Sequence, residues 1–374
     1  MRVTLKEIAD RVGVSRPLVS FVLNNAKGSM AISAEKRQRI IDVARELGYI
    51  PNLSAQVLSG KPSRTIGLVN VCVIQYSVAI QINHFLNYAP KLGYQLLLDP
   101  IPHPMRELEV YRESLRNILS RSVDGLIFLG SPPPEILEMA RIPNVIVGLP
   151  HGRKDADGVF DFTTDLKAGG YLAGKHLLGH EHRKILLLCT NYNSAYLKLE
   201  GLQQAWREAG LPLENVRMIE AFIEPAEERV LTSIREGFTC GLMSNDFIGA
   251  RLMQFLSLNG IRVPDDFALI GYDGDAFAYL LNPPLTSVAS AFEDNARMAF
   301  ELLISRIERG DAQNIGRTSR LLKPSLFLGG SCGCPWPPPE KLVRKRDMLF
   351  LRENMPEQMI PYDDCMNLLD NPDK

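Results

Sequence analysis

Apolar residues near the amino terminus recur at helical spacing in three short segments. Thr4 and Glu7 form a capping-box pattern before the first segment, which ends at Gly13, and Ser15 and Ser33 are favourable N-caps for the other two. The positions expected to face inward are Leu5, Ile8, Ala9, Val12, Leu18, Val19, Val22, Leu23, Ile40, Ile41, Val43, Ala44 and Leu47. Two helices joined by a glycine turn, with a third helix completing the core, are typical of a helix-turn-helix. A generic three-helix bundle is the alternative.

From residue 65 the pattern changes to apolar runs of strand length that alternate with helical patterns. The predicted strands are 66–69, 94–98, 123–129, 144–148, 184–189, 240–244 and 267–271, and clear helical patterns cover 167–178 and 198–209. Alternation of this kind predicts parallel sheets with helices on both faces. Its length favours two α/β lobes in series, with a ligand cleft at the carboxyl ends of the strands.

Charge is distributed unevenly along the 374 residues. The whole chain has a formal net charge of −1, but residues 1–64 contain eleven basic and five acidic residues, whereas the rest contains 31 and 38. The first segment therefore carries +6 and the remainder −7. This asymmetry predicts a polyanionic partner for the first segment only.

Several classes of protein are excluded by composition. The chain begins without the apolar core of a secretory signal and contains no apolar run of about 20 residues, so we expect no membrane partner. Six scattered cysteines are typical of a reducing compartment. These features predict a cytoplasmic protein.

No motif of catalytic or metal-binding chemistry emerges from the sequence. The run His180-Glu181-His182 lacks the zincin spacing, and Cys332-Gly333-Cys334 has no second cysteine pair at ligand spacing. Both are interpreted as structural, which predicts no metal and no cofactor. A glycine-rich phosphate loop and a nucleophile elbow are also missing from the sequence, so we do not expect an enzyme.

Residues 3–25 (VTLKEIADRVGVSRPLVSFVLNN) and 31–69 (AISAEKRQRIIDVARELGYIPNLSAQVLSGKPSRTIGLV) resemble the DNA-binding head of the LacI/GalR family of transcriptional regulators. The resemblance implies that the second helix enters the major groove. It assigns DNA contacts to Thr4, Ser15, Arg16, Pro17, Ser20, Phe21, Asn24, Asn52, Ala55 and Leu58. Phe21 stands where the family often has arginine, so the operator sequence cannot be transferred.

The same resemblance implies a short hinge helix over residues 52–58. A helix of this length is marginal in water, so we expect it to become ordered when two copies pack together on DNA. By resemblance, Ala55 faces the minor groove and Leu58 is a wedge between the central base steps. An ordinary linker leucine is the alternative for Leu58.

The body also resembles the family, as far as about Cys334, and is similar to periplasmic sugar-binding proteins. In the family, the positions of Lys198, Asn245 and Asp273 point into the effector cleft. A cation, an amide and a carboxylate can together satisfy the hydroxyls of a sugar or related metabolite. Lys198 replaces the usual arginine and loses its planar fork. Helix capping by Asp273 and turn formation by Asn245 and Asp246 are the alternatives.

Together these patterns predict a multi-domain chain. We expect an all-α helix-turn-helix domain over 1–50, a hinge over 51–64, and two α/β lobes of periplasmic-binding-protein type I over 65–331. Residues 332–374 form a proline-rich extension, predicted to be loose after residue 355, with no assigned role. The predicted function is effector-controlled repression through a pseudo-palindromic operator, by a homodimer or a higher oligomer. A solute-binding protein of sugar transport is the alternative.

Overall fold

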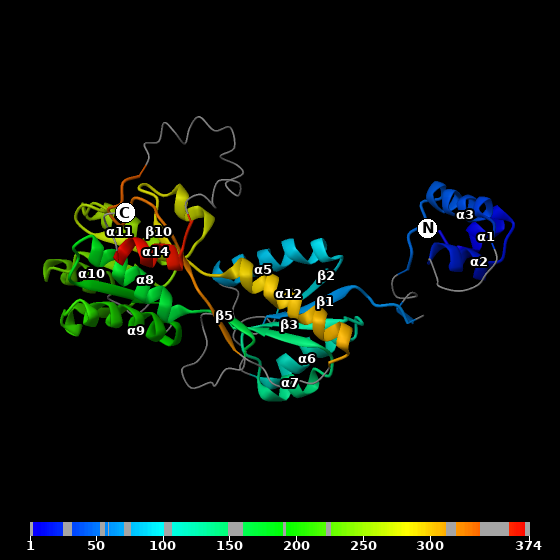
Figure 1. Cartoon of the computed structure of the whole chain (residues 1–374), viewed down its shortest axis with the longest axis horizontal. Helices are drawn as coiled ribbons and strands as arrows, with labels where there is room; N and C mark the ends of the chain where they lie inside the picture. Colours follow the sequence, from blue (N-terminus) through cyan, green and yellow to red (C-terminus); the bar gives the residue numbers. More distant parts are fainter. Residues whose placement is uncertain are drawn as a thin grey trace. The chain divides into compact units, whose positions relative to one another are not determined.

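The computed structural model describes residues 3–24, 32–52, 57–58, 60–70, 76–100, 107–148, 160–189, 192–221, 226–311, 319–336 and 359–370. The chain divides into two compact units (Figure 1). The first comprises residues 1–65 with 122–124 and contains the helical head. The second comprises residues 66–121 and 125–374 and contains the two-lobed body.

Three helices form the head: α1 (Leu5–Val12), α2 (Arg16–Leu23) and α3 (Ala34–Glu46). The predicted N-caps Thr4, Ser15 and Ser33 are confirmed, and the capping box is complete because the Thr4 backbone N–H donates to Glu7 Oε2 at 2.7 Å. The buried core of the head consists of Ile8, Ala9, Val19, Val22, Ile40, Val43 and Ala44. The other predicted inward positions lie half-buried around this core.

The amino-terminal lobe of the body is built on a sheet with the strand order β11-β5-β4-β3-β1-β2. Its strands are β1 (Thr65–Asn70), β2 (Gln95–Pro100), β3 (Gly125–Leu129), β4 (Asn144–Val147), β5 (Phe162–Thr164) and β11 (Arg320–Leu322). Pairing is parallel from β1 through β3, β4 and β5 to β11. Helices α5 (Tyr76–Tyr88) and α12 (Phe292–Arg309) share a buried apolar core with one face. Helices α6 (Leu108–Leu119) and α7 (Pro134–Met139) lie on the opposite side (Figure 1).

The carboxyl-terminal lobe contains the sheet β13-β12-β10-β9-β8-β6-β7. Its strands are β6 (Ile185–Cys189), β7 (Val216–Glu220), β8 (Cys240–Met243), β9 (Ala268–Asp273), β10 (Thr286–Ala289), β12 (Ser325–Phe327) and β13 (Met359–Pro361). β7 through β10 pair in parallel, and β12 and β13 are antiparallel to their neighbours. Helices α8 (Leu166–Gly179) and α9 (Tyr192–Glu208) cover one face, and α10 (Ala226–Arg235) and α11 (Asp246–Leu258) cover the other. Short 3-10 helices are η1 (Ala89–Leu92), η2 (Leu213–Asn215) and η3 (Ala276–Leu280).

The chain passes between the two lobes from β5 to α8, from β10 to α12, and from β11 to β12. At these crossings the backbone N–H of Ala291 donates to Thr164 Oγ1 at 3.1 Å, and Lys323 Nζ lies 3.0 Å from Asp165 Oδ2. The predicted fold of two α/β lobes with mainly parallel sheets is therefore confirmed.

Helices α8 and α9 approach each other through glycines. A Cβ atom added at Gly170 would lie 2.1 Å from the Lys198 carbonyl oxygen, and one added at Gly201 would lie 2.1 Å from the Lys167 carbonyl oxygen. Side chains at these positions would therefore separate the helices. This contact fixes α9, which carries Lys198, against the rest of the lobe.

The prediction of a loose segment after residue 355 was wrong for residues 359–370. β13 pairs with β12, and α14 (Tyr362–Asp370) contacts α8. Tyr362 and Met366 pack against the buried core of the carboxyl-terminal lobe. Apolar residues spaced along α14 supply this contact, although proline and charged residues surround them in sequence. Within the described ranges, none of the helices combines the length and apolarity needed to cross a membrane.

Candidate DNA-binding surface and effector site

The first turn of α2 presents the exposed part of the helix-turn-helix. Ser15, Arg16 and Pro17 are all exposed, and the Ser15 hydroxyl accepts from the Leu18 backbone N–H at 3.4 Å. Pro17 is accommodated because the first-turn N–H groups have no partner within the helix. The head therefore offers the Arg16 guanidinium at the amino end of a helix, where base-reading side chains of such motifs lie.

The remaining predicted contacts on α2 are partly engaged within the head. Phe21 is half-buried and packs against the core of the head. The Asn24 amide donates to Ser20 Oγ at 3.1 Å. Thr4 is exposed, but its hydroxyl accepts from the Glu7 backbone N–H at 3.3 Å. These residues have structural roles in the head, and their contacts with DNA stay predictions.

The predicted hinge is only partly within the described residues. Asn52 is exposed, whereas Ala55 lies outside the described ranges. Leu58 is 90% exposed. Exposing an apolar side chain of this size to water is unfavourable. Its exposure is therefore consistent with a surface that becomes covered in a complex.

Lys198 occupies the centre of the candidate effector site. Its side chain extends from α9 into the carboxyl-terminal lobe and is only 1% exposed. The ammonium donates to the Ser244 carbonyl oxygen at 2.7 Å and lies 3.5 Å from the centre of the Tyr272 ring. A buried ammonium needs such partners, because removing it from water is costly.

Asp273 lies at the carboxyl end of β9 and is also buried. Its Oδ1 accepts from Ser290 Oγ at 3.2 Å. Its backbone has φ = 101°, a left-handed conformation that costs energy for a residue with a Cβ atom. The helix-capping alternative does not hold for Asp273, because Asp275 caps η3 by accepting from the Phe277 N–H at 3.3 Å.

Burial shifts the pKa values of Lys198 and Asp273 toward each other. Desolvation lowers the pKa of Lys198 to about 8, although Asp273 and Asp246 oppose this shift. Desolvation raises the pKa of Asp273 to about 6, although Lys198 and the Ser290 hydrogen bond oppose it. Between these two values both groups are charged, so the site contains a cation and an anion that together are neutral.

The side chains of Asn245 and Asp246 form hydrogen bonds that stabilise the local fold. The Asn245 Oδ1 accepts from the Ile248 N–H at 2.9 Å and caps α11, whereas the alternative predicted for this residue was turn formation. Asp246 is buried and accepts from Ser287 Oγ and the Asp275 N–H, each at 2.6 Å. Desolvation raises the pKa of Asp246 well above its usual range. An effector role for Asn245 would use its amide NH₂ group or the second lone pair of Oδ1 and stays a prediction.

Sequence reasoning missed two groups that contact Lys198, Ser244 and Tyr272, and a carboxyl group at another strand end, Glu220. Glu220 ends β7 beside Cys189, which ends β6. Glu220 Oε2 and the Tyr272 hydroxyl are buried and have no hydrogen-bond partner among the described residues. Buried polar atoms of this kind require water or a ligand. Their positions at strand ends were the available signal.

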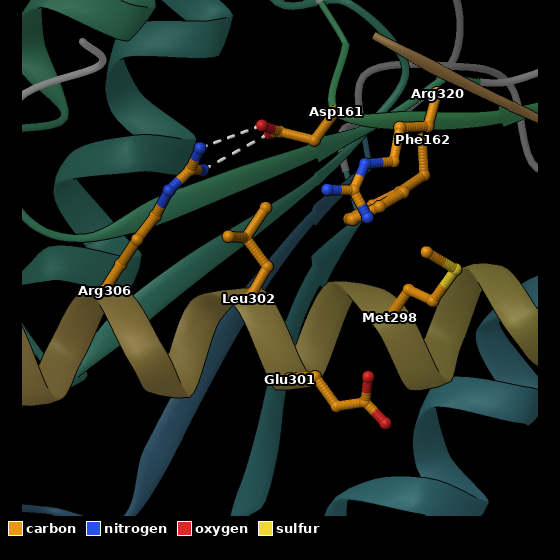
Figure 2. A pocket seen from close by; sticks show the side chains of 7 residues that line it. All are labelled: Asp161, Phe162, Met298, Glu301, Leu302, Arg306 and Arg320. Carbon is orange, nitrogen blue, oxygen red and sulfur yellow. Dashed lines mark hydrogen bonds and ion pairs between the residues drawn. The ribbon is translucent and has the colours of Figure 1, made fainter. Parts of the chain in front are cut away.

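A cavity of about 310 Å³ lies away from these residues, in the amino-terminal lobe (Figure 2). It runs between α12 and the edge of the sheet and is lined by Asp161, Phe162, Met298, Glu301, Leu302, Arg306 and Arg320. Arg306 Nη2 and Asp161 Oδ1 are 2.9 Å apart and largely buried, so this ion pair joins α12 to β5. None of the three predicted effector residues lines this cavity, and we assign it a structural role.

Four histidine and cysteine side chains meet elsewhere in the carboxyl-terminal lobe. His176, His180, Cys332 and Cys334 bring their ligand atoms within 4.8 Å of one another. From the sequence, the run His180-Glu181-His182 is interpreted as structural; His182 is not part of this cluster, and its Nδ1 lies 2.9 Å from Thr239 Oγ1. Hydrogen bonds from Cys334, His176 and His180 lower the pKa of the Cys332 thiol. The available signal was the four-residue spacing of His176 and His180, at the end of the helical pattern predicted over 167–178.

A basic helix-turn-helix head joined to a two-lobed α/β body defines a DNA-binding regulator with a sensor domain. Residues 4–52 match the bacterial regulatory proteins of the lacI family, and residues 175–332 match the periplasmic binding protein-like domain. The HTH-type transcriptional repressor PurR of Vibrio vulnificus (strain CMCP6) is 30% identical over 317 residues, which are 82% of this chain and 92% of that protein. The chain belongs to the lacI family of bacterial regulatory proteins and is a DNA-binding transcriptional regulator.

A further relative agrees with this assignment, and solved structures agree with the fold. PurR of Haemophilus influenzae (strain PittEE) is 27% identical over 340 residues, covering 87% of this chain and 97% of that protein. The fold is similar to the Lac repressor dimer bound to operator and the anti-inducer ONPF, with a TM-score of 0.72 and 22% identity over 89% of this chain and 99% of that one. It is also similar to a LacI-family regulator from Enterococcus faecium with bound ribose, with a TM-score of 0.58 and 22% identity over 71% and 98%.

Proposed function

We propose that this protein is a repressor that binds a pseudo-palindromic operator as a homodimer and is controlled by a small polar effector. The observation that carries the DNA-binding part is the exposed first turn of α2, with Arg16 at its amino end, in a segment of net charge +6. Two heads carried by a dimer reach half-sites about one helical turn apart, which requires an operator of matching symmetry. Genomic DNA as the target places the protein in the cytoplasm.

For base recognition, we assign Arg16 the leading role. Its guanidinium has five donors and can bind a guanine edge in a bidentate manner. Pro17 and Phe21 offer only apolar contacts, which suit a thymine methyl group. Thr4, Ser15, Ser20 and Asn24 are assigned to the phosphates. Their short polar side chains can hold the register of the head without reading sequence.

For the hinge, we assign Asn52, Ala55 and Leu58 to the minor groove. The exposure of Leu58 supports this assignment, because insertion between base steps would remove its apolar surface from water. Ordering of two short helices depends on their mutual packing, so it depends on the separation of the two hinges. A change of lobe arrangement on effector binding would therefore be transmitted to DNA affinity.

For the effector, we assign Lys198 and Asp273 as the principal contacts, with Asn245 at the edge of the site. The Lys198 ammonium and the Asp273 carboxylate offer donors and acceptors of opposite charge, which suits an uncharged ligand with several hydroxyl groups. The buried Tyr272 hydroxyl, beside Lys198, lacks a partner among the described residues and supports a polar ligand there. A sugar or a related metabolite fits this chemistry. We propose binding without catalysis, because the relatives of this chain are transcriptional repressors.

The test uses full-length protein and a truncation that lacks residues 1–60, with random DNA and fragments selected from the genome. The account predicts that the full-length chain retards selected fragments at concentrations at least about tenfold below those needed for random DNA. It also predicts that the truncation loses this preference but keeps thermal stabilisation by the effector. Equal, weak retardation by both proteins would contradict the proposal.

A second test separates the effector site from the DNA-binding head. A panel of sugars and related metabolites is screened by thermal unfolding of the full-length chain. Asp273→Ala should lose the stabilisation given by any ligand found, and should retain operator binding in the absence of ligand. Unchanged stabilisation in Asp273→Ala would place the effector elsewhere.

A further inference from the structure

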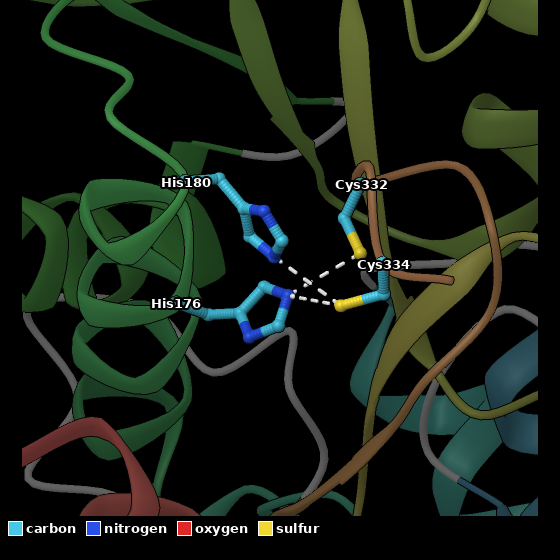
Figure 3. A group of neighbouring side chains, drawn as sticks. All are labelled: His176, His180, Cys332 and Cys334. Carbon is cyan, nitrogen blue, oxygen red and sulfur yellow. Dashed lines mark hydrogen bonds between the residues drawn. The ribbon is translucent and has the colours of Figure 1, made fainter. Parts of the chain in front are cut away.

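Two histidines and two cysteines form a compact cluster at one face of the carboxyl-terminal lobe (Figure 3). His176 lies in the last turn of α8 and His180, four residues later, caps the carboxyl end of this helix, so their side chains lie on the same side of it. Cys332 and Cys334 lie in the segment that follows β12, more than 150 residues away in sequence. Figure 3 shows the two imidazoles and the two thiols pointing toward a common centre.

The distances within this cluster fit a tetrahedral metal ion. His176 Nε2 lies 3.3 Å from Cys332 Sγ and 3.6 Å from Cys334 Sγ, and His180 Nε2 lies 3.2 Å from Cys334 Sγ. Zinc bonds of about 2.1 Å to nitrogen and about 2.3 Å to sulfur, at a tetrahedral angle, separate the two ligand atoms by about 3.6 Å. The four ligand atoms therefore have nearly the spacing that a shared zinc ion requires.

The backbone that carries the two cysteines is held in place independently of any ion. Ser331 Oγ donates to the Leu269 carbonyl oxygen at 2.7 Å and accepts from the Thr286 N–H at 2.9 Å. Gly333 has φ = 96°, which glycine adopts without strain and which turns the chain between the two cysteines. The site is thus preorganised on both sides, by the helix α8 and by this turn.

The environment suits an enclosed structural site. Cys332 is 1% exposed and His176 is 6% exposed, whereas His180 and Cys334 are half-buried. Thr286 Oγ1 lies 3.0 Å from Cys332 Sγ, where a hydroxyl can stabilise a thiolate. Two thiolates balance the charge of a divalent cation, so the occupied site would be neutral despite its burial.

We propose that His176, His180, Cys332 and Cys334 bind one Zn²⁺ ion. Two nitrogen and two sulfur ligands in a tetrahedral arrangement select zinc over the oxygen-preferring cations. Four protein ligands leave no open position, so the ion has a structural role. The ion would join α8 to the segment that follows β12. In the same lobe, β13 pairs with β12 and α14 contacts α8. This proposal does not depend on the identity of the effector or on DNA binding.

The first test measures metal in the full-length chain, purified without a metal-affinity tag from cells supplied with zinc. Elemental analysis should find about one zinc ion per chain, and removal by a strong chelator should lower the unfolding temperature, with recovery on addition of zinc. His180→Gln and Cys334→Ser should each retain less than about a tenth of the zinc. His182→Gln is the matched control and should retain all of it.

A ligand variant could fail to fold, so the second test uses the unaltered chain. After zinc is removed, Co²⁺ should give the intense visible bands of a tetrahedral site and a thiolate-to-cobalt charge-transfer band. Added zinc should displace both. Three outcomes would overturn the proposal: a chain without metal and with free thiols, a disulfide between Cys332 and Cys334, or cobalt spectra without thiolate character.

Discussion

The ammonium group of Lys198 lies 3.5 Å from the centre of the Tyr272 ring, inside the carboxyl-terminal lobe. This cation–π contact is buried, and such contacts are strongest when water is excluded. The Tyr272 hydroxyl has no hydrogen-bond partner among the described residues, and a Cβ atom added at Gly169 would lie 2.0 Å from it. The ring therefore supports the lysine, whereas the hydroxyl contributes little to stability without a ligand.

Tyr272→Phe and Tyr272→Leu separate these two roles. Tyr272→Phe keeps the ring and should change the free energy of unfolding by less than about 1 kcal/mol. The hydroxyl that it removes makes no hydrogen bond among the described residues, so no bond is broken. Tyr272→Leu removes the ring and should cost about 2–4 kcal/mol through the cavity and the lost cation–π contact. Urea unfolding of both variants measures the difference. Equal losses would show that the hydroxyl has a partner that stabilises the fold.

Asp273→Asn tests the raised pKa of the buried carboxyl. The native chain holds this proton up to a pH of about 6, whereas the unfolded chain releases it near its usual pKa of 3.8. Native protein thus binds more protons in this interval, so the wild type should lose stability as pH rises from about 4 to about 6. The shift corresponds to about 3 kcal/mol. Asp273→Asn has no proton to release, and should lack this component of the slope.

The comparison is made by chemical unfolding of both proteins across that pH interval. Groups remote from Asp273 titrate alike in both chains, so their contribution cancels in the difference between wild type and variant. A constant difference would mean that Asp273 titrates normally in the folded chain.

Gly201→Ala tests the close contact of α8 and α9. The added methyl group would lie 2.1 Å from the Lys167 carbonyl oxygen and 2.5 Å from the Tyr171 nitrogen, both in the backbone. The helices would have to separate, so we expect a loss of at least about 1–3 kcal/mol in the free energy of unfolding. Arg207→Ala, at an exposed position of the same helix, is the control and should change it by less than about 0.5 kcal/mol. Similar stabilities for both variants would disprove the tight packing.

Arg16→Ala tests the base-reading role assigned to the first turn of α2. Loss of a bidentate contact should weaken binding to selected genomic fragments by about 1–3 kcal/mol, which is about five- to 150-fold. Binding to random DNA should weaken far less. The exposed Arg207 lies on the body, so Arg207→Ala should leave both affinities unchanged. Gel retardation of both kinds of DNA measures these affinities. An equal loss of affinity for each would assign Arg16 to phosphate contacts.

Leu58→Ala tests the proposed wedge. Removal of the side chain should weaken binding to selected fragments by about tenfold or more and should reduce DNA bending, because the central step is no longer unstacked. Leu258→Ala is a matched control, because Leu258 is an 80% exposed leucine on the body. Affinity and bending are read from gel mobility of circularly permuted fragments. A variant that binds and bends DNA like the wild type would favour an ordinary linker leucine.

Local patterns in the sequence were sufficient to predict the head and most of the sheets. The caps at Thr4, Ser15 and Ser33 act within one helical turn, so their short-range hydrogen bonds are visible in sequence. Buried parallel strands such as β3 and β6 are continuous apolar runs and were predicted for the same reason. The strands β5, β11, β12 and β13 have only three residues each, too few to show a period, and the longer strands β7 and β10 were also not predicted.

Contacts between distant segments could not be predicted in this way. α9 begins at Tyr192, six residues before the predicted start, and the tail helix α14 is stable only because it packs on α8. The His176–Cys332 approach joins residues 156 positions apart. The resemblance to a family placed Lys198 and Asp273 together, but the ring of Tyr272 and the capping role of Asn245 became visible only in the fold.

Selection of genomic fragments by the full-length protein, followed by sequencing, tests most directly that this chain is a sequence-specific regulator. The account predicts enrichment of a pseudo-palindromic site whose half-sites are about one helical turn apart. Binding to that site should be lost when residues 1–60 are removed, and it should change when the effector is added. Recovery of fragments without a common sequence, at the same yield for the full-length chain and the truncation, would contradict the central claim.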